Sequence, residues 1–121
     1  MSRNHDNLRV FHVADSLVIE VYRATAAFPS AERDGLRPQL RRAVISIAAN
    51  IVEGSARRSK ADYSRFLDIA LGSATEADYL LDVSHRLGLM PADAYARCKS
   101  SSSHVLRGLQ KLIDALARLE P

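Results

Sequence analysis

The chain has 121 residues, a formal net charge of +3, a pI of about 9.4, few aromatic residues and a single cysteine. This length suits one domain with its own core. The lone Cys98 excludes an intrachain disulfide framework and favours a reducing cytoplasm. The polar N-terminus has no secretion signal, and the longest apolar run, 43–52, is too short to cross a membrane. We therefore expect one cytoplasmic domain over residues 1–121, with a flexible N-terminal tail at 1–7 and no membrane partner.

The first half of the chain predicts two helices. Apolar residues recur at helical spacing after Asp6 or Asn7, either of which can cap the first helix, and Pro29 ends it. Gly35, in the connection that follows, is available for a positive φ angle. The second helix, predicted over 37–56, is apolar on two adjacent faces, so it needs neighbours on more than one side. The residues expected at an interface between subunits are Ile45, Ala49 and Val52.

The second half predicts two further helices. Ser59 and Asp62 resemble a capping box at the start of the third helix, which Gly88 closes. Pro91 begins the fourth helix. Its serine run, 100–103, is the expected site of bending or fraying, because serine side chains compete for backbone hydrogen bonds. Four helices joined by short loops predict an all-α, antiparallel up-down-up-down bundle.

A narrow polar stripe follows one side of the second helix and faces polar residues on the third. We interpret it as a structural hydrogen-bonded network in which Arg42 pairs with Glu76, in preference to a ligand-binding or acid-base site. This preference rests on the general rule that buried polar groups have partners. The residues of the predicted network are Arg42, Ser46, Asn50, Glu53, Ser73 and Glu76.

Cations concentrate around the turn between the second and third helices. From Arg33 to Arg65, eight Lys and Arg side chains accompany three acidic ones, a net charge of +5. One reading is a solvated junction in which Arg57 and Arg58 favour the negative end of the second helix. The other is a phosphate-contact patch that an oligomer repeats around its axis, with little sequence preference because no aromatic cluster accompanies the cations. The candidate nucleic-acid-binding residues are Arg37, Arg41, Arg57, Arg58, Lys60 and Arg65.

Catalytic and metal-binding motifs are not recognisable in the sequence. The pairs Gly54-Ser55 and Gly72-Ser73 lack the flanking pattern of a nucleophile elbow. The four histidines do not have the spacing of metal ligands. We therefore expect no enzymatic activity, no catalytic residues, no metal and no cofactor.

A longer pattern of residues resembles a known family, the 23S rRNA-intervening sequence proteins. The residues that carry the resemblance are Val10, Ala14, Leu17, Val21, Tyr22, Phe28-Pro29, Glu32, Gly35-Leu36, Gln39 to Ala43, Ser46-Ile47, Asn50-Ile51, Glu53-Gly54, Phe66-Leu67, Ile69-Ala70, Gly72-Ser73 and Glu76. The resemblance implies a four-helix bundle that assembles as a homo-oligomer, typically a pentamer. It also implies a relationship to the accessory variability determinant of diversity-generating retroelements, a basic pentamer that binds nucleic acid and a reverse transcriptase.

Two classes of function follow from the residues and the resemblance. The first is a non-enzymatic homo-oligomeric bundle that binds the backbone of RNA or DNA through the basic turn. The alternative is an oligomeric structural or adaptor protein that binds a protein partner, for example a reverse transcriptase, and has no direct role with nucleic acid.

Overall fold

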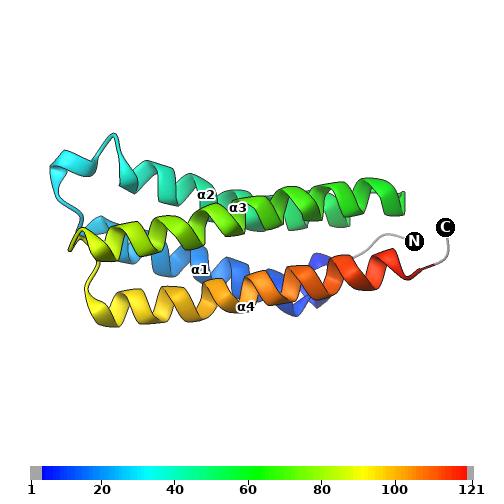
Figure 1. Cartoon of the computed structure of the whole chain (residues 1–121). Coiled ribbons are helices and arrows are strands. Elements are labelled where there is room, and N and C mark those ends of the chain that lie inside the picture. The colour runs from blue at the N-terminus through cyan, green and yellow to red at the C-terminus, as the bar shows by residue number, and fades with distance from the viewer. Residues whose placement is uncertain (1–3, 120–121) are drawn as a thin grey trace.

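The computed structural model describes residues 4–119, which form four α-helices, two short 3-10 helices and no β-strand. The elements in chain order are η1 (His5–Asn7), α1 (Arg9–Ala26), η2 (Ser30–Glu32), α2 (Leu36–Ser55), α3 (Lys60–Arg86) and α4 (Ala92–Ala117). Consecutive helices run in opposite directions, and α4 returns to pack against α1, so that each helix contacts two neighbours (Figure 1). The predicted all-α fold with four helices is confirmed.

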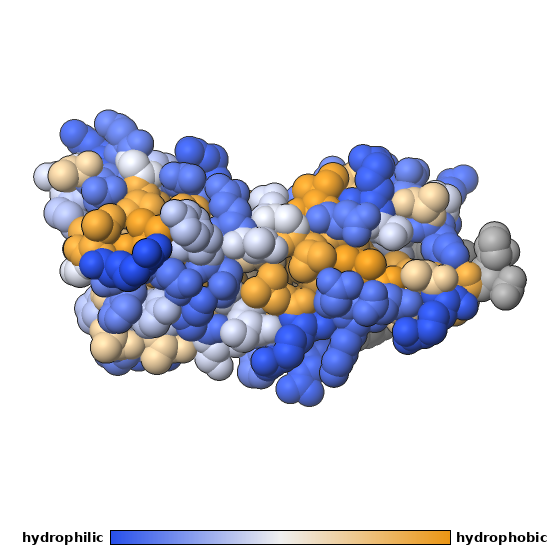
Figure 2. All heavy atoms as spheres, in the orientation of Figure 1, coloured by the Kyte–Doolittle hydropathy of each residue, from blue (hydrophilic) through white to orange (hydrophobic). Residues whose placement is uncertain are grey.

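One hydrophobic core runs along the axis of the bundle and draws side chains from all four helices. Its largest fully buried members include Leu17, Leu40, Ile47, Leu67, Leu81 and Leu109. Burying each of these side chains stabilises the fold by about 1.5–3 kcal/mol relative to exposing it. On the face in Figure 2, with α3 and α4 in front, hydrophobic residues gather in two areas framed by hydrophilic ones. Half-buried side chains such as Leu71 and Ile113 extend the core outward between these helices.

Two glycines bring neighbouring helices unusually close together. A Cβ atom at Gly54 of α2 would lie 2.9 Å from Cβ of Phe66 in α3. A Cβ atom at Gly108 of α4 would lie 2.8 Å from Cγ2 of Val10 in α1. Any larger residue at these positions must push the helices apart, so both close contacts depend on glycine.

The N-terminal end of α1 differs from the sequence prediction. Capping by Asp6 or Asn7 is wrong, because α1 begins at Arg9 after Leu8, and no side chain caps it. The side chain of Asn4 instead accepts a hydrogen bond from the backbone N–H of Asp6, at the start of η1. Residues 5–7 of the expected flexible tail thus form a 3-10 turn, and residues 1–3 lie outside the described part of the chain.

The connections show which local signals determined the helix ends. Gly35 does not adopt positive φ; its φ is −116°, and a Cβ atom there would lie 2.7 Å from Oε1 of Glu32. That oxygen accepts a hydrogen bond from the N–H of Leu36, so glycine leaves room for a side chain that caps α2. Ser59 caps α3 by accepting from the N–H of Asp62 at 3.0 Å, as predicted. Gly88, with φ +75°, closes α3 in a left-handed cap.

The serine run of α4 is helical throughout, so fraying there is wrong. Two of its hydroxyls point to neighbouring helices instead of competing for the backbone. Ser101 donates to Glu20 of α1 at 2.7 Å, and Ser102 donates to Asp78 of α3 at 2.9 Å. Hydroxyls with partners on other helices bind α4 to them, which offsets the poor helix propensity of serine.

The two ends of the bundle carry different parts of the chain. The start of α1 and the end of α4 lie at the same end of the bundle as the α2–α3 turn, whereas the α1–α2 and α3–α4 connections lie at the other end (Figure 1). At about 1.5 Å per residue, Arg41 is separated by roughly 21 Å from Ser55, the last residue of α2 before the turn that carries Arg57. The six candidate nucleic-acid-binding residues therefore divide between two distant places.

Candidate nucleic-acid interface

The α2–α3 turn is short and tightly built. The chain leaves α2 after Ser55, and the N–H of Arg57 donates to the carbonyl of Gly54 at 3.0 Å. Ser59 then caps α3, which begins at Lys60. Only four residues, 56–59, separate the helices, so Arg57 and Arg58 are held close together at one corner of the bundle, where α2 ends and α3 begins.

Phe66 organises two of the cations at this corner. Its ring is half-buried, and the guanidinium groups of Arg57 and Arg65 lie 5.0 Å and 4.7 Å from its centroid. The negative face of an aromatic ring attracts cations at such distances. The ring thus gathers two positive charges that are eight residues apart in the sequence. Sequence reasoning missed this role of Phe66, because neighbours one residue apart on a helix are not expected to face each other.

The other two cations of the turn differ in their surroundings. Arg58 is exposed, and no hydrogen bond or ion pair connects it to residues 4–119. Lys60 is half-buried and donates from Nζ to the carbonyl of Leu119 at 2.8 Å, which ties α3 to the end of α4. Arg65 also faces Asp62 at 3.8 Å, but both side chains are more than half exposed, so this pairing is weak.

Arg37 and Arg41 lie away from this corner and contact α1 and the connection after it. Arg37 donates from Nη2 to the carbonyl of Phe28. Arg41 donates to Thr25 Oγ1 at 2.8 Å and to the carbonyl of Tyr22 at 3.1 Å, and its guanidinium lies 4.3 Å from the Tyr22 ring centroid. Both arginines thus link α2 to α1 and the connection after it, whereas the buried Nε of Arg37 has no hydrogen-bond partner within residues 4–119.

The polar stripe of α2 is only partly connected. Ser46 Oγ lies 2.8 Å from Ser73 Oγ, and Asn50 Nδ2 donates to Ser46 at both its carbonyl, 2.7 Å, and its hydroxyl, 3.1 Å. The predicted pair between Arg42 and Glu76 is wrong. Glu76 accepts instead from Gln39 Nε2, at 3.4 Å, because Gln39 lies one helical turn before Arg42 on the same side of α2.

The remaining members of the stripe and the expected interface residues lie at the surface. Glu53 is exposed and has no hydrogen bond or ion pair to the described part of the chain. Ile45 is 43% exposed, Ala49 is exposed and Val52 is half-buried. Ile45 lines a mainly apolar depression with Tyr22 and Pro38, between α1 and α2. In a single chain, this face of α2 therefore remains exposed to solvent.

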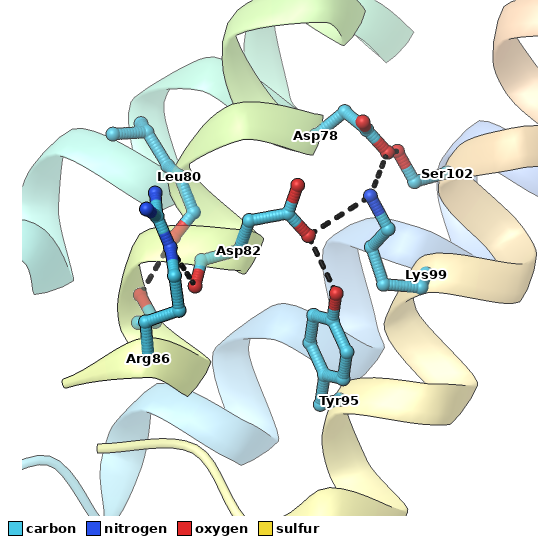
Figure 3. A network of polar contacts seen from close by, with 8 residues as sticks. Asp78, Leu80, Asp82, Arg86, Tyr95, Lys99 and Ser102 are labelled. Atoms are coloured by element: carbon cyan, nitrogen blue, oxygen red, sulfur yellow. Dashed lines mark hydrogen bonds and ion pairs between the residues drawn. The ribbon is translucent and has the colours of Figure 1, made fainter. Parts of the chain in front are cut away.

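A second polar cluster, which sequence reasoning missed, joins α3 to α4 (Figure 3). Lys99 lies between two carboxylates, with Nζ 2.9 Å from Asp78 Oδ1 and 3.0 Å from Asp82 Oδ1. Tyr95 donates to Asp82 at 2.6 Å, and Ser102 donates to Asp78 at 2.9 Å. Its signal in the sequence was the matching spacing of two faces, since the aspartates are four residues apart and Tyr95, Lys99 and Ser102 share one face of α4.

Hydrogen bonding within this cluster shifts three pKa values. The bond from Tyr95 lowers the pKa of Asp82, which partial burial opposes and Lys99 reinforces. The bond to Asp82 raises the pKa of Tyr95. Burial acts to lower the pKa of Lys99, but its bonds to Asp78 and Asp82 outweigh that effect and raise it. At neutral pH these shifts favour an ionised Asp82, a protonated Tyr95 and a charged Lys99, which are the forms that make the bonds between α3 and α4.

Chemical reactivity is not indicated elsewhere in the described residues. Burial raises the pKa of the Cys98 thiol to about 11, which disfavours the reactive thiolate. Within residues 4–119, no three His, Cys, Asp or Glu side chains come together in a group suited to a metal ion. In the same range, no helix combines the length and the apolar character needed to span a membrane.

A comparison with protein-family models identifies the class. The model of the 23S rRNA-intervening sequence protein family matches residues 6–111, which include all of α1, α2 and α3 and most of α4. The chain therefore belongs to this family, as its residues suggested. No curated protein matches the chain.

A solved crystal structure has a similar fold. The chain is similar to a crystal structure from Bacteroides thetaiotaomicron VPI-5482, described as a protein of unknown function from the S23 ribosomal protein family. The two share 25% sequence identity with a TM-score of 0.77, and the match covers 92% of this chain and 99% of that one. The relative thus shares the whole fold, and its description assigns no activity.

Proposed function

We propose that the protein is a non-enzymatic homo-oligomeric bundle that binds the backbone of RNA or DNA through its α2–α3 turn. The binding residues are Arg57, Arg58, Lys60 and Arg65. The observation that carries the proposal is the arrangement of Arg57 and Arg65 on the ring of Phe66, beside the exposed Arg58. Charges held in fixed positions at a corner contact phosphates with a smaller loss of side-chain entropy.

The six candidate cations do not contribute equally to this proposal. Arg37 and Arg41 lie toward the other end of α2, away from the turn, and donate to α1 and the connection after it, so we assign them a structural role. The four residues at the turn carry the proposed binding. The aromatic ring at this turn, that of Phe66, is half-buried beneath two arginines and offers no stacking platform. Binding is therefore expected to depend on phosphate and to show little preference for base sequence.

The experiment that tests nucleic-acid binding compares two charge-reversed variants with the wild type. We expect purified wild-type protein to carry nucleic acid, seen as a raised ratio of absorbance at about 260 nm to that at about 280 nm, which a high-salt wash removes. Arg57→Glu/Arg58→Glu/Lys60→Glu should carry none. Arg23→Glu/Arg33→Glu/Arg86→Glu, which changes the net charge equally at exposed sites away from the turn and from the uncovered face of α2, should retain it. Equal absorbance ratios in the two variants would contradict the proposal.

Homo-oligomerisation is a separate part of the proposal and rests on the uncovered face of α2. Ile45, Ala49 and Val52 present apolar surface there, beside the depression that Ile45 shares with Tyr22. Burial of this face in a ring, which we propose to be a pentamer, would also bring several basic turns into one structure and strengthen their field.

Light scattering tests the assembly. We expect the wild type to have the mass of a ring and Ile45→Glu to form smaller species, because a carboxylate cannot be buried without a partner. Ile69→Glu is a matched control, since Ile69 of α3 is equally exposed, at 43%, but lies outside the proposed interface. A monomeric wild type, or an unchanged mass for Ile45→Glu, would contradict this placement.

The same apolar face supports the alternative function, an oligomeric adaptor for a protein partner such as a reverse transcriptase. Affinity capture with and without nuclease distinguishes the two functions. A specific partner retained after digestion of nucleic acid favours the adaptor, whereas a partner released by digestion was held through nucleic acid.

A further inference from the structure

A groove runs along the seam between α1 and α4, on a face that the proposed function does not use. Its first section, a depression of about 530 Å³, has a floor that includes Leu8, Val13 and Leu112. The next section shares Arg9, Val13 and His104 with the first and reaches Glu20. The last section shares Glu20 and reaches Ala27. The three sections follow α1 over its whole length, roughly 27 Å at about 1.5 Å per residue.

Small residues on both helices create this groove. Ser16 and Ala24 line it from α1, and Ala94, Ser101 and Gly108 line it from α4. Such side chains do not fill the space above the contact between two cylindrical helices. The floor between them is apolar where Leu8, Val13 and Leu112 remain half-buried. A partner's apolar side chains can therefore reach the seam.

The charge of the groove is positive. Five cations and two carboxylates line its three sections, a net charge of +3. Both carboxylates already have partners, because Asp93 faces Arg97 at 3.7 Å and Glu20 accepts from Ser101 at 2.7 Å. Four of the cations, in contrast, form no hydrogen bond or ion pair with the chain from residue 4 to 119. These four are Arg9, Arg23, Arg107 and Lys111.

We propose that this groove binds an acidic amphipathic helix of a protein partner. A helix of about 18 residues matches the length of the groove, and its apolar stripe would lie on the floor. Acidic residues beside that stripe would face Arg9 on one side and Arg107 and Lys111 on the other. Nucleic acid suits the groove less well, because phosphates gain nothing from the apolar floor. Among the described residues, the aromatic side chains that line it are the small rings of His12 and His104, with no Phe or Tyr.

The test uses a defined peptide probe and the intact protein. The probe is a fluorescein-labelled helical peptide of about 18 residues, with leucines along one face and glutamates beside them. One control peptide has lysine in place of every glutamate, and a second has the same composition in scrambled order. Fluorescence anisotropy should show binding of the glutamate peptide and no binding of either control.

Two protein variants locate the binding in the groove. Arg107→Glu/Lys111→Glu removes the cationic rim, and Ser16→Trp fills the groove at an exposed position; each should weaken peptide binding by at least about tenfold. Matched controls are Arg33→Glu/Arg42→Glu, with the same change in charge, and Thr75→Trp, at an exposed position of α3. These should change the affinity less than about twofold. Arg57→Glu/Arg58→Glu/Lys60→Glu should also bind the peptide normally, so this proposal and the proposed function can fail separately.

Three results would overturn the proposal. The first is a glutamate peptide that does not bind the wild type, or binds all variants equally. The second is a change in oligomer mass caused by Ser16→Trp, which would make the groove an interface between copies of this chain. The third is loss of RNA binding in Ser16→Trp with no effect on the peptide, which would make the groove a path for nucleic acid.

Discussion

The polar cluster around Lys99 and the basic α2–α3 turn, which lie at opposite ends of α3, use charge in opposite ways. Near the end of α3, Lys99 lies between Asp78 and Asp82, with side chains 26%, 27% and 38% exposed, and each charge has a partner within the chain. At its beginning, Arg57 and Arg65 share the ring of Phe66, and Arg58 extends into solvent. The first cluster neutralises its charges to join two helices, whereas the second keeps positive charge at the surface. Local density of charged residues therefore does not distinguish a paired cluster from an exposed one; the positions of the counter-charges do.

The largest expected effect comes from removing the central cation of the paired cluster. Lys99→Ala leaves Asp78 and Asp82 facing each other, half-buried and without their shared partner, and should lower the free energy of unfolding by about 1–2 kcal/mol. Arg58→Ala should change it by less than about 0.5 kcal/mol, because an exposed side chain without a partner contributes little. Urea denaturation measures both. Similar losses in the two variants would mean that the clusters do not differ as described.

A smaller effect, on the pH dependence of stability, sharpens the same comparison. Folding lowers the pKa of Asp82 below its ordinary value of 3.8. The Asp82 carboxylate therefore stabilises the fold fully above that pH, and this stabilisation is lost as the pH falls through the lower pKa of the folded protein. Between about pH 5 and pH 2, the wild type should therefore lose about 0.5 kcal/mol more stability than Asp82→Asn, a modest amount because the side chain is partly exposed. Parallel curves for the two proteins in acid denaturation would contradict the role of Asp82.

The sequence predicted the helices well because their signals are local. The period of the apolar residues, the cap at Ser59 and the closing glycine at Gly88 each act within one or two turns. The start of α1 was missed because no side chain caps it, and Asn4 caps the preceding turn instead. Gly35 was misinterpreted because its reason is the approach of the Glu32 side chain, which only the folded connection reveals.

The candidate site was predictable as a composition but not as an arrangement. The basic turn is visible as a run of cations, whereas the grouping of Arg57 and Arg65 on Phe66 depends on the angle at which α3 leaves the turn. Arg41 looked equivalent to the other cations, and its bonds to α1 depend on how α1 and α2 pack. The cluster around Lys99 needed the pairing of α3 with α4. The spacing on each helix was visible in the sequence, but which two faces meet depends on long-range packing.

The most direct test of the central claim is the salt dependence of RNA binding. Fluorescence anisotropy with a labelled polyuridine of about 20 nucleotides, between about 50 and 500 mM KCl, should give for the wild type a steep linear fall of log affinity with log salt. Arg58→Ala should reduce that slope by about 0.7, the share of one phosphate contact on a single strand, and Arg57→Glu/Arg58→Glu/Lys60→Glu should abolish binding. Equal affinities and slopes for the wild type and the triple variant would show that the α2–α3 turn does not contact the backbone.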